Sequence, residues 1–376
     1  DTYLEWLYSA YQNSNPNVPS DPATAQTCQD CHMRSTLEGA PMVTGLANVE
    51  NTSWPDPPAK NLAPAEDITV PAREEYKRHT LFGMNLFVLY MYRQFAETIF
   101  GLEPDSNVPM GTTDPYDFAI ETGERQIRDR TASVEILSVS LDADGRSGSQ
   151  RELAARVRVT NQAGHRLPSG VGFRRAWLEF SVLDEQDGIL WSSGEADEQG
   201  DIIGPDADPL ASEFTGDWTQ LQPHWAEISD PTQVQIYEER YVNRYEGSNE
   251  LQLTTSVLGI GEVVKDNRLL PRGYEYDYLL RQYRIGDPSD RETFESLLPR
   301  SLFDQLPPGA TDPNDDPSYV DGSGADEITY RIPLRDIPGA ARVRARLNYQ
   351  SIPPYYLRDR FSTGRGPQSQ RLYYLI

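Results

Sequence analysis

The chain contains only two cysteines, and both lie in one short segment, where Cys28 and Cys31 are followed directly by His32. Because the two thiols are so close in sequence, no disulfide can connect distant parts of the 376 residues, and the fold must depend on core burial. With two cysteines and four histidines placed at random, this arrangement has a probability on the order of 10^-4, so chance is a poor explanation of it.

The spacing of these residues is typical of covalent haem attachment. Two thiols two residues apart reach the two vinyl groups of one porphyrin, and the adjacent histidine then lies under the iron. The motif therefore predicts one haem c, with Cys28 and Cys31 forming the thioethers and His32 as the proximal ligand. Such attachment takes place outside the cytoplasm, so we expect a periplasmic, extracellular or cell-surface protein. No secretory signal stands at the start, so we expect a processed form or a fragment.

Three other interpretations of the cysteines are weaker. A zinc site needs four convergent ligands, and His32 cannot easily turn toward the metal that the adjacent Cys31 would bind. A redox-active dithiol is expected between a strand and a helix, whereas the flanking residues 22–27 and 33–35 have the composition of a loop and a short helix. A structural disulfide leaves the histidine unexplained.

The sixth iron ligand separates electron transfer from catalysis, because two histidines close the iron and an open position permits ligand binding. His79 is the first candidate, since it stands just ahead of an apolar stretch, residues 86–99, that is expected to form a helix able to line a porphyrin. Its alternative is a helix-start histidine bonded to backbone.

His165, which follows a glycine at a strand end, is an alternative ligand for this haem or for one on a neighbouring chain. Its plainer interpretation is a loop histidine bonded to turn carbonyls. The remaining candidates rank lower: His224, Met33, Met42, Met84, Met91 and Met110. Of these, Met33 is too near the proximal histidine to reach the opposite face, and Met84 and Met91 are interpreted as packing residues.

Hydrophobic periodicity divides the chain near residue 131. The first part, residues 1–130, predicts a small helical haem-binding domain. Its expected helices lie near residues 4–11, 73–100 and 118–130.

After residue 131 apolar residues alternate with polar ones, which is typical of half-buried strands. The alternation is clearest over residues 153–159, 176–182, 328–334 and 343–349. Residues 131–376 therefore predict an antiparallel, immunoglobulin-like β-sandwich, with a partly helical insertion near 274–306. The expected fold class is α+β.

Charge and hydropathy exclude two classes of partner. The net charge of -24 argues against nucleic acid or an anionic membrane as the main partner, because like charges repel. The most apolar run, residues 84–91, is far shorter than the roughly 20 residues that are needed to span a bilayer.

An acidic loop, residues 312–316, together with Asp321 and Asp326, offers oxygen ligands suited to calcium. It lacks the glycine and glutamate spacing of an EF-hand, and a solvated acidic loop is the commoner structure. Calcium is therefore a minor hypothesis.

Segments from both halves of the chain carry a family pattern. They are residues 5–7, 27–33 and 79–85 in the first half, and 160–170, 174–178, 233–238, 265–271 and 349–354 in the second. Together they resemble the bacterial multihaem c-type cytochromes of respiratory and extracellular electron transfer, over most of the chain.

This resemblance implies an electron carrier with a haem ligated by two histidines and a C-terminal β domain. It also implies that His79, which precedes the Gly83–Asn85 segment, is the distal ligand. Those relatives carry several such haem motifs and this chain carries one. The chain is thus either a single-haem branch, or further haems lie on a missing segment or a partner chain.

The leading hypothesis is a non-enzymatic carrier of single electrons. Its expected partners are other cytochromes or redox proteins, including copies of itself or multihaem subunits. One alternative is a haem enzyme with an open iron site, such as a peroxidase or small-molecule reductase. Another is a docking or structural subunit of a larger multihaem assembly. The enzyme is the weaker alternative, because no acid–base pair is evident beside the motif and a histidine is available to close the iron.

Overall fold

The structure is a computed structural model. It describes residues 2–33, 36–37, 40–41, 81, 83–101, 115–142, 151–244 and 251–376. The chain divides into two compact units, one formed by residues 1–25 and 84–376 and the other by residues 26–83. The predicted division into residues 1–130 and 131–376 stays a prediction.

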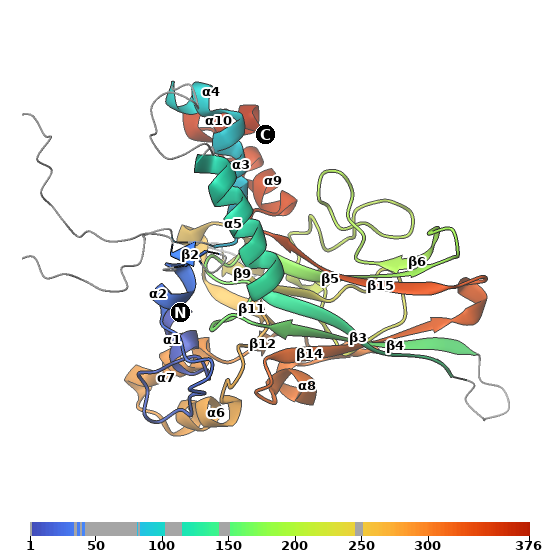
Figure 1. The fold of residues 1–376 in the computed structure, drawn as a ribbon, viewed down its shortest axis with the longest axis horizontal. Coiled ribbons are helices and arrows are strands. Elements are labelled where there is room, and N and C mark those ends of the chain that lie inside the picture. The colour runs from blue at the N-terminus through green and yellow to red at the C-terminus, as the bar shows by residue number, and fades with distance from the viewer. Residues whose placement is uncertain are drawn as a thin grey trace, which may run out of the picture. The chain divides into compact units, whose positions relative to one another are not determined.

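Helices are concentrated near the two ends of the chain and in one stretch before residue 300 (Figure 1). The α-helices are α1 (Thr2–Leu7), α2 (Cys28–His32), α3 (Leu86–Gln94), α4 (Ala96–Phe100), α5 (Pro115–Arg130), α6 (Tyr276–Ile285), α7 (Pro288–Ser296), α8 (Pro317–Val320), α9 (Pro354–Thr363) and α10 (Pro367–Leu375). The 3-10 helices are η2 (Trp218–Gln220), η3 (Val257–Gly259), η4 (Pro313–Asp315) and η5 (Leu334–Asp336).

Most strands lie between residues 132 and 350. They are β3 (Ala132–Asp142), β4 (Glu152–Asn161), β5 (Arg175–Leu183), β6 (Ile189–Ser193), β7 (His224–Trp225), β8 (Glu227–Ile228), β9 (Ile236–Arg244), β10 (Leu251–Thr254), β11 (Glu262–Asp266), β12 (Arg300–Ser301), β13 (Ala310–Thr311), β14 (Ala325–Pro333) and β15 (Arg342–Gln350). The short pair β1 (Thr36–Leu37) and β2 (Ala40–Pro41) belongs to the smaller unit.

Two sheets form the centre of the larger unit. One has the order β12-β11-β9-β5-β15, with β10 beside β9 and β6 beside β5, and the other has the order β3-β4-β14-β8. Neighbouring strands are antiparallel except β14 and β8, which are parallel. The predicted α+β class with a sheet-rich domain is confirmed, whereas these strand orders do not confirm an immunoglobulin-like topology.

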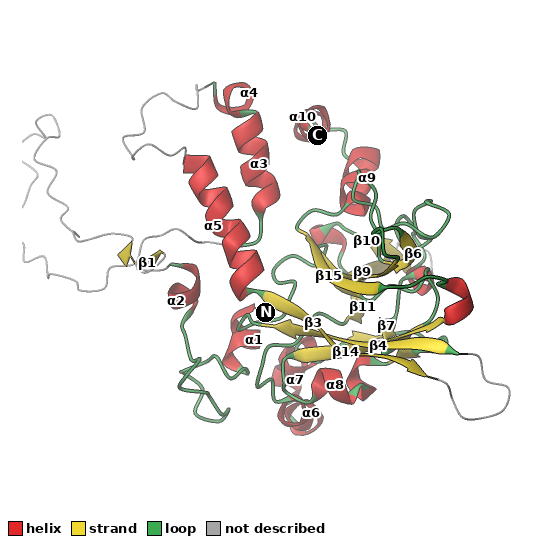
Figure 2. Cartoon of the chain, turned by 45° about the vertical axis from the view of Figure 1, so that its right-hand side comes forward, coloured by secondary structure: helices red, strands yellow, loops and turns green. Residues whose placement is uncertain are grey.

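The core lies between the two sheets (Figure 2). Phe180 on β5 stacks on Tyr330 on β14 with ring centroids 4.0 Å apart, and both side chains are fully buried. Burial alternates along β4, as the sequence predicts for a strand with one face on a core. Stacking of aromatic rings from opposite sheets fixes the two layers against each other.

Strand β5 differs from its expected half-buried pattern. Trp177 and Ser181, on the face predicted to be solvated, are buried, with exposed fractions of 3% and 1%. Trp177 packs in a second cluster with Ile236 of the neighbouring strand β9 and with Ile202 and Leu210, whose segment covers this face of the sheet. Periodicity within one strand cannot show such a cover, because the covering residues are far away in sequence.

The described helices differ from the sequence pattern in several places. Helices α9 and α10 occupy residues 354–375, where the β domain is expected, and α3 begins only at Leu86. Helix α1 ends at Leu7 because the Ser9 hydroxyl donates to the Trp6 carbonyl at 2.8 Å and so competes with the helix ladder. Within the helix expected near residues 73–100, the chain leaves the helical conformation at Phe95, which has φ -121° and ψ 27°. Helices α6 and α7 lie inside the predicted insertion.

Helices α6, α7 and α8 form a third apolar cluster with α1 (Figure 1). Its buried members include Tyr274, Leu297 and Tyr319, against which Leu4 and Tyr8 pack. None of the described helices is both long and apolar enough to cross a membrane.

Candidate haem attachment site

The haem motif forms a short helix whose start is encoded in its own sequence. Thr27 precedes α2 with an extended backbone, and its hydroxyl accepts the Asp30 N–H at 3.2 Å. In return the Asp30 carboxylate accepts the Thr27 backbone N–H at 2.8 Å and the Thr27 hydroxyl at 2.7 Å. This reciprocal capping box stabilises the helix over the motif itself.

The helix determines how the two thiols are presented. Cys28 and Cys31 are three positions apart, so they lie on neighbouring turns of the same helix side. Neither is in a disulfide. Cys28 is exposed, whereas Cys31 is half-buried with its Sγ 3.2 Å from the Gln26 side-chain oxygen. His32, the last residue of α2, is half-buried.

These residues fit a covalently attached haem. Two reduced thiols on one side of a helical turn, with an imidazole in the next position, form the donor set that attachment and proximal ligation require. A thioredoxin-like dithiol would require a strand before the motif, and the described residues 2–27 contain none.

Some of the candidate distal ligands lie outside the described residues, and others lie within them. His79 lies outside the described residues, as do Met42 and Met110. His165 is half-buried, and its Nδ1 lies 3.0 Å from the Arg166 carbonyl oxygen. Because a carbonyl only accepts, Nδ1 carries the proton in this contact.

Met84, Met33 and His224 are packed among other residues of the protein. Met84 packs against the main core, and Met33 is 8% exposed. His224, on β7, is only 1% exposed, and Gln235 lies 2.9 Å from its Nδ1. A haem therefore cannot reach this imidazole without displacing the packed residues around it.

His224 instead faces Asp316 and Asp326. Its Nε2 lies 3.4 Å from an Asp316 oxygen and 3.9 Å from an Asp326 oxygen. From the sequence, His224 is a low-ranked candidate iron ligand, and Asp316 and Asp326 belong to a candidate calcium site. No sequence signal connects the histidine with the two aspartates. Only the tertiary fold, which places β7, β14 and the start of α8 side by side, brings the three together.

The carboxylates of the acidic loop form turns and caps. Asp312 accepts the Asn314 N–H, and Asp316 accepts the Ser318 N–H, each at 2.8 Å. Asp321 accepts the Ser323 N–H at the same distance. These local bonds explain the positions of Asp312 and Asp321 without an ion, whereas the second oxygen of Asp316 faces His224.

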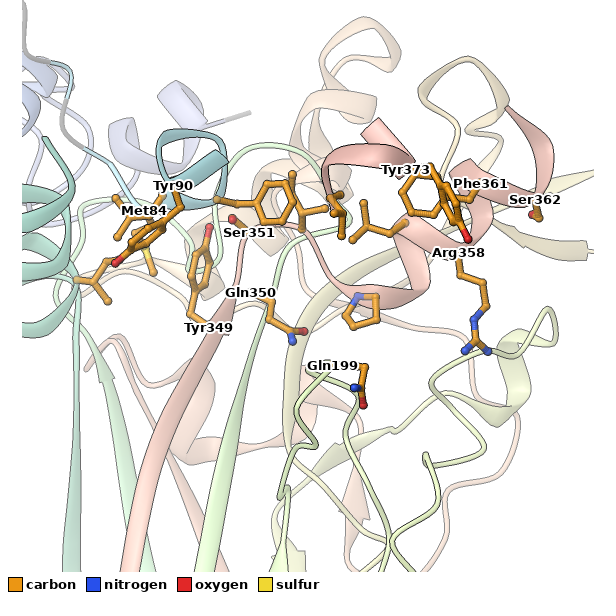
Figure 3. A pocket seen from close by; sticks show the side chains of 17 residues that line it. Met84, Tyr90, Gln199, Tyr349, Gln350, Ser351, Arg358, Phe361, Ser362 and Tyr373 are labelled. Carbon is orange, nitrogen blue, oxygen red and sulfur yellow. The ribbon is translucent and has the colours of Figure 1, made fainter. Parts of the chain in front are cut away.

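An apolar cavity of about 860 Å³ lies in the larger unit between α3, α5, the end of β15 and the C-terminal helices (Figure 3). Met84, Tyr90 and Tyr349 line one part, and Arg358 and Phe361 line another. The Tyr90 hydroxyl donates to Glu124, and this hydrogen bond raises the pKa of Tyr90.

Comparisons with known proteins identify no family. No family model and no curated protein matches the chain. A solved structure, the penta-haem cytochrome c552 from Thermochromatium tepidum, is similar at 16% identity with a TM-score of 0.30. The match covers 64% of this chain and 37% of that one, so the chain spans little more than a third of that protein. A likeness at this level carries no argument.

Proposed function

We propose that the chain is a c-type cytochrome that transfers single electrons through one haem. The haem is attached to Cys28 and Cys31 and ligated by His32. When bound, it supplies an iron that accepts and releases one electron. The observation that carries the proposal is the capped helix α2, which presents both thiols on one side with the imidazole directly after them.

The chain's own residues have three tasks in this function. Thr27 and Asp30 hold the motif in helical form before and after attachment. His32 binds the iron from one side, and His79 binds it from the other, with His165 as the alternative. The large acidic excess of the chain favours a basic docking face on its redox partners, because opposite charges steer association.

The location and partners follow from the attachment chemistry. Because haem is attached outside the cytoplasm, the protein works in the periplasm or on the cell exterior. With a single haem, long-range transfer requires haems on other chains, so the partners are other cytochromes or redox proteins, including copies of this chain.

The first experiment measures attachment. The chain is produced in cells that attach haem c, and its mass and visible spectrum are recorded. We expect the polypeptide mass plus one haem and a Soret band that survives acid–acetone extraction. The Cys28→Ser, Cys31→Ser double variant is expected to lose both. A Met91→Leu variant, which keeps all the proposed ligands, serves as the control. A wild-type chain with the mass of its amino acids alone would overturn the proposal.

The second experiment identifies the sixth ligand. The ferric protein is expected to be low-spin and unchanged by cyanide, because two histidines close the iron. His79→Ala is expected to give a high-spin spectrum, and His165→Ala to leave it low-spin. The reverse outcome would assign His165 instead. A high-spin wild type that binds cyanide or peroxide would contradict a closed carrier and favour a haem enzyme.

A further inference from the structure

A buried cluster in the larger unit combines one imidazole with two carboxylates from separate elements. His224 lies on β7, Asp316 caps α8 and Asp326 lies on β14. Their exposed fractions are 1%, 4% and 0%. One atom of each, namely His224 Nε2, Asp316 Oδ2 and Asp326 Oδ1, is buried without a hydrogen-bond partner among the described residues.

The three unpartnered atoms point toward one another. They all lie within 4.8 Å of each other, with Nε2 3.4 Å from the Asp316 oxygen and 3.9 Å from the Asp326 oxygen. A hydrogen bond between nitrogen and oxygen is usually about 2.7–3.2 Å long. Two ligands bound at about 2.0–2.2 Å to one tetrahedral ion lie roughly 3.3–3.6 Å apart. The spacing is therefore closer to that of ligands around an ion than to that of hydrogen-bonded groups.

In the described part of the chain, the single group beside the two carboxylates that can carry positive charge is the His224 imidazole, so two negative charges face at most one positive charge. Among the described residues, neither Asp316 nor Asp326 pairs with an arginine or lysine. Burial raises the pKa of Asp326, as expected for a carboxylate removed from water. Two carboxylates in this environment call for a positive charge between them.

The remaining atoms of the carboxylates are held in place. Asp316 Oδ1 accepts the Ser318 N–H and hydroxyl, each at 2.8 Å. Asp326 Oδ2 accepts the Tyr237 hydroxyl at 2.7 Å and the Gln235 amide at 3.0 Å. Such outer contacts orient metal ligands in proteins and leave their other oxygen pointing into the site.

Gln235 also contacts the imidazole. Its oxygen accepts the Trp225 N–H at 2.7 Å, so its amide nitrogen faces Nδ1 of His224 at 2.9 Å. Nδ1 is then the acceptor, and Nε2 carries the imidazole proton while the site holds no ion. To bind a cation, the proton must move to Nδ1 and the Gln235 amide must turn to accept it. This turn gives up the Gln235 hydrogen bonds to the Trp225 N–H and to Asp326 Oδ2. The bound cation offsets that loss by supplying a counter-charge to two buried carboxylates.

We propose that His224, Asp316 and Asp326 bind one divalent transition-metal ion, of the kind represented by Zn²⁺ or Mn²⁺. The nitrogen ligand favours such an ion over Ca²⁺. The ion is structural, because all three ligands are buried, and it ties α8 and the acidic loop to β7 and β14. The site does not depend on the haem.

The test uses the full haem-loaded chain. It is stripped of loosely held metal with a chelator, equilibrated with Zn²⁺ or Mn²⁺, and analysed for bound metal other than iron and for thermal unfolding. We expect one equivalent per chain and a higher unfolding temperature with metal. Asp316→Asn keeps an oxygen that can cap α8 but removes the charge, and it is expected to weaken metal binding at least 100-fold.

A matched control comes from the neighbouring cap. Asp312 accepts a backbone N–H two residues on, as Asp316 does, but lies outside the cluster. Asp312→Asn is therefore expected to bind metal like the wild type. Equal uptake by Asp316→Asn and wild type, or no uptake by wild type, would overturn the proposal and leave a proton or water in the cluster. Should Asp316→Asn fail to fold, the response of chelated wild type to added Zn²⁺ decides: a raised unfolding temperature supports the site and an unchanged one refutes it.

Discussion

At the scale of single residues, the haem motif depends on the residue before it. Thr27 lies outside the Cys28–His32 helix, yet its hydroxyl and backbone make both halves of the capping box with Asp30. A helix this short has little propensity to form alone. The cap therefore has a large share in keeping the two thiols and the imidazole in helical order.

We expect Thr27→Ala to loosen this helix. Loss of the cap costs about 1 kcal/mol, which corresponds to roughly fivefold faster exchange where local opening controls it. Hydrogen exchange followed by mass spectrometry over residues 26–33 measures the change in the haem-loaded protein. Thr27→Ser, which keeps the hydroxyl, is the control. Equal exchange in wild type and Thr27→Ala would show that the cap does not stabilise the motif.

At the scale of elements, helix α1 is tied to the β-sandwich by a buried charge. Glu5 is 1% exposed and accepts the Arg166 backbone N–H at 3.1 Å. Its other oxygen lies 3.5 Å from the Arg268 guanidinium, which also pairs with Asp266 at 2.8 Å. One carboxylate on a six-residue helix thus joins a network anchored on β11.

Removing that carboxylate is expected to destabilise the fold. Glu5→Ala leaves a buried backbone N–H and a guanidinium without their acceptor, which costs about 3 kcal/mol. Glu5→Gln keeps an acceptor and is expected to cost less. Urea unfolding measures both, with Tyr3→Ala, at a position 60% exposed, as the control on the same helix. If Glu5→Ala and Tyr3→Ala were equally stable, the proposed anchor would be wrong.

At the scale of the whole molecule, ion pairs lie inside the larger sheet. Glu238 is 2% exposed, with the Lys265 ammonium 2.9 Å and the Arg240 guanidinium 3.2 Å from its oxygens. Burial alone would raise the pKa of Glu238, but these two cations outweigh it and lower the pKa to about 2. The stability of the fold is therefore linked to pH through this group.

The sign of this linkage is fixed by the lowered pKa. The contribution of Glu238 is complete above its usual pKa of 4.5 and is lost as pH falls toward 2. It amounts to roughly 3 kcal/mol, since each pKa unit corresponds to about 1.4 kcal/mol. Urea unfolding between pH 5 and pH 2.5 is expected to show a flatter pH dependence for Glu238→Gln than for wild type. Glu185→Gln, at an exposed position, is expected to match wild type. Parallel curves for Glu238→Gln and wild type would contradict this assignment.

Features that depend only on neighbouring residues can be predicted from the sequence. Haem attachment needs Cys28, Cys31 and His32 at fixed short spacing, and the capping box needs only Thr27 and Asp30, so both can be predicted locally. The alternation of β4 likewise predicted a strand with one buried face, because side chains on a strand point alternately to opposite sides.

Which distant residues meet becomes evident only in the folded molecule. In the fold, a distant segment covers the outer face of β5, Glu5 is buried against Arg166, and His224 lies beside Asp316 and Asp326. Each of these arrangements joins segments that are remote in sequence, and the chain near any one of them carries no mark of the others. They arise because strand pairing and core packing place those segments side by side, which a period of two or 3.6 residues cannot encode.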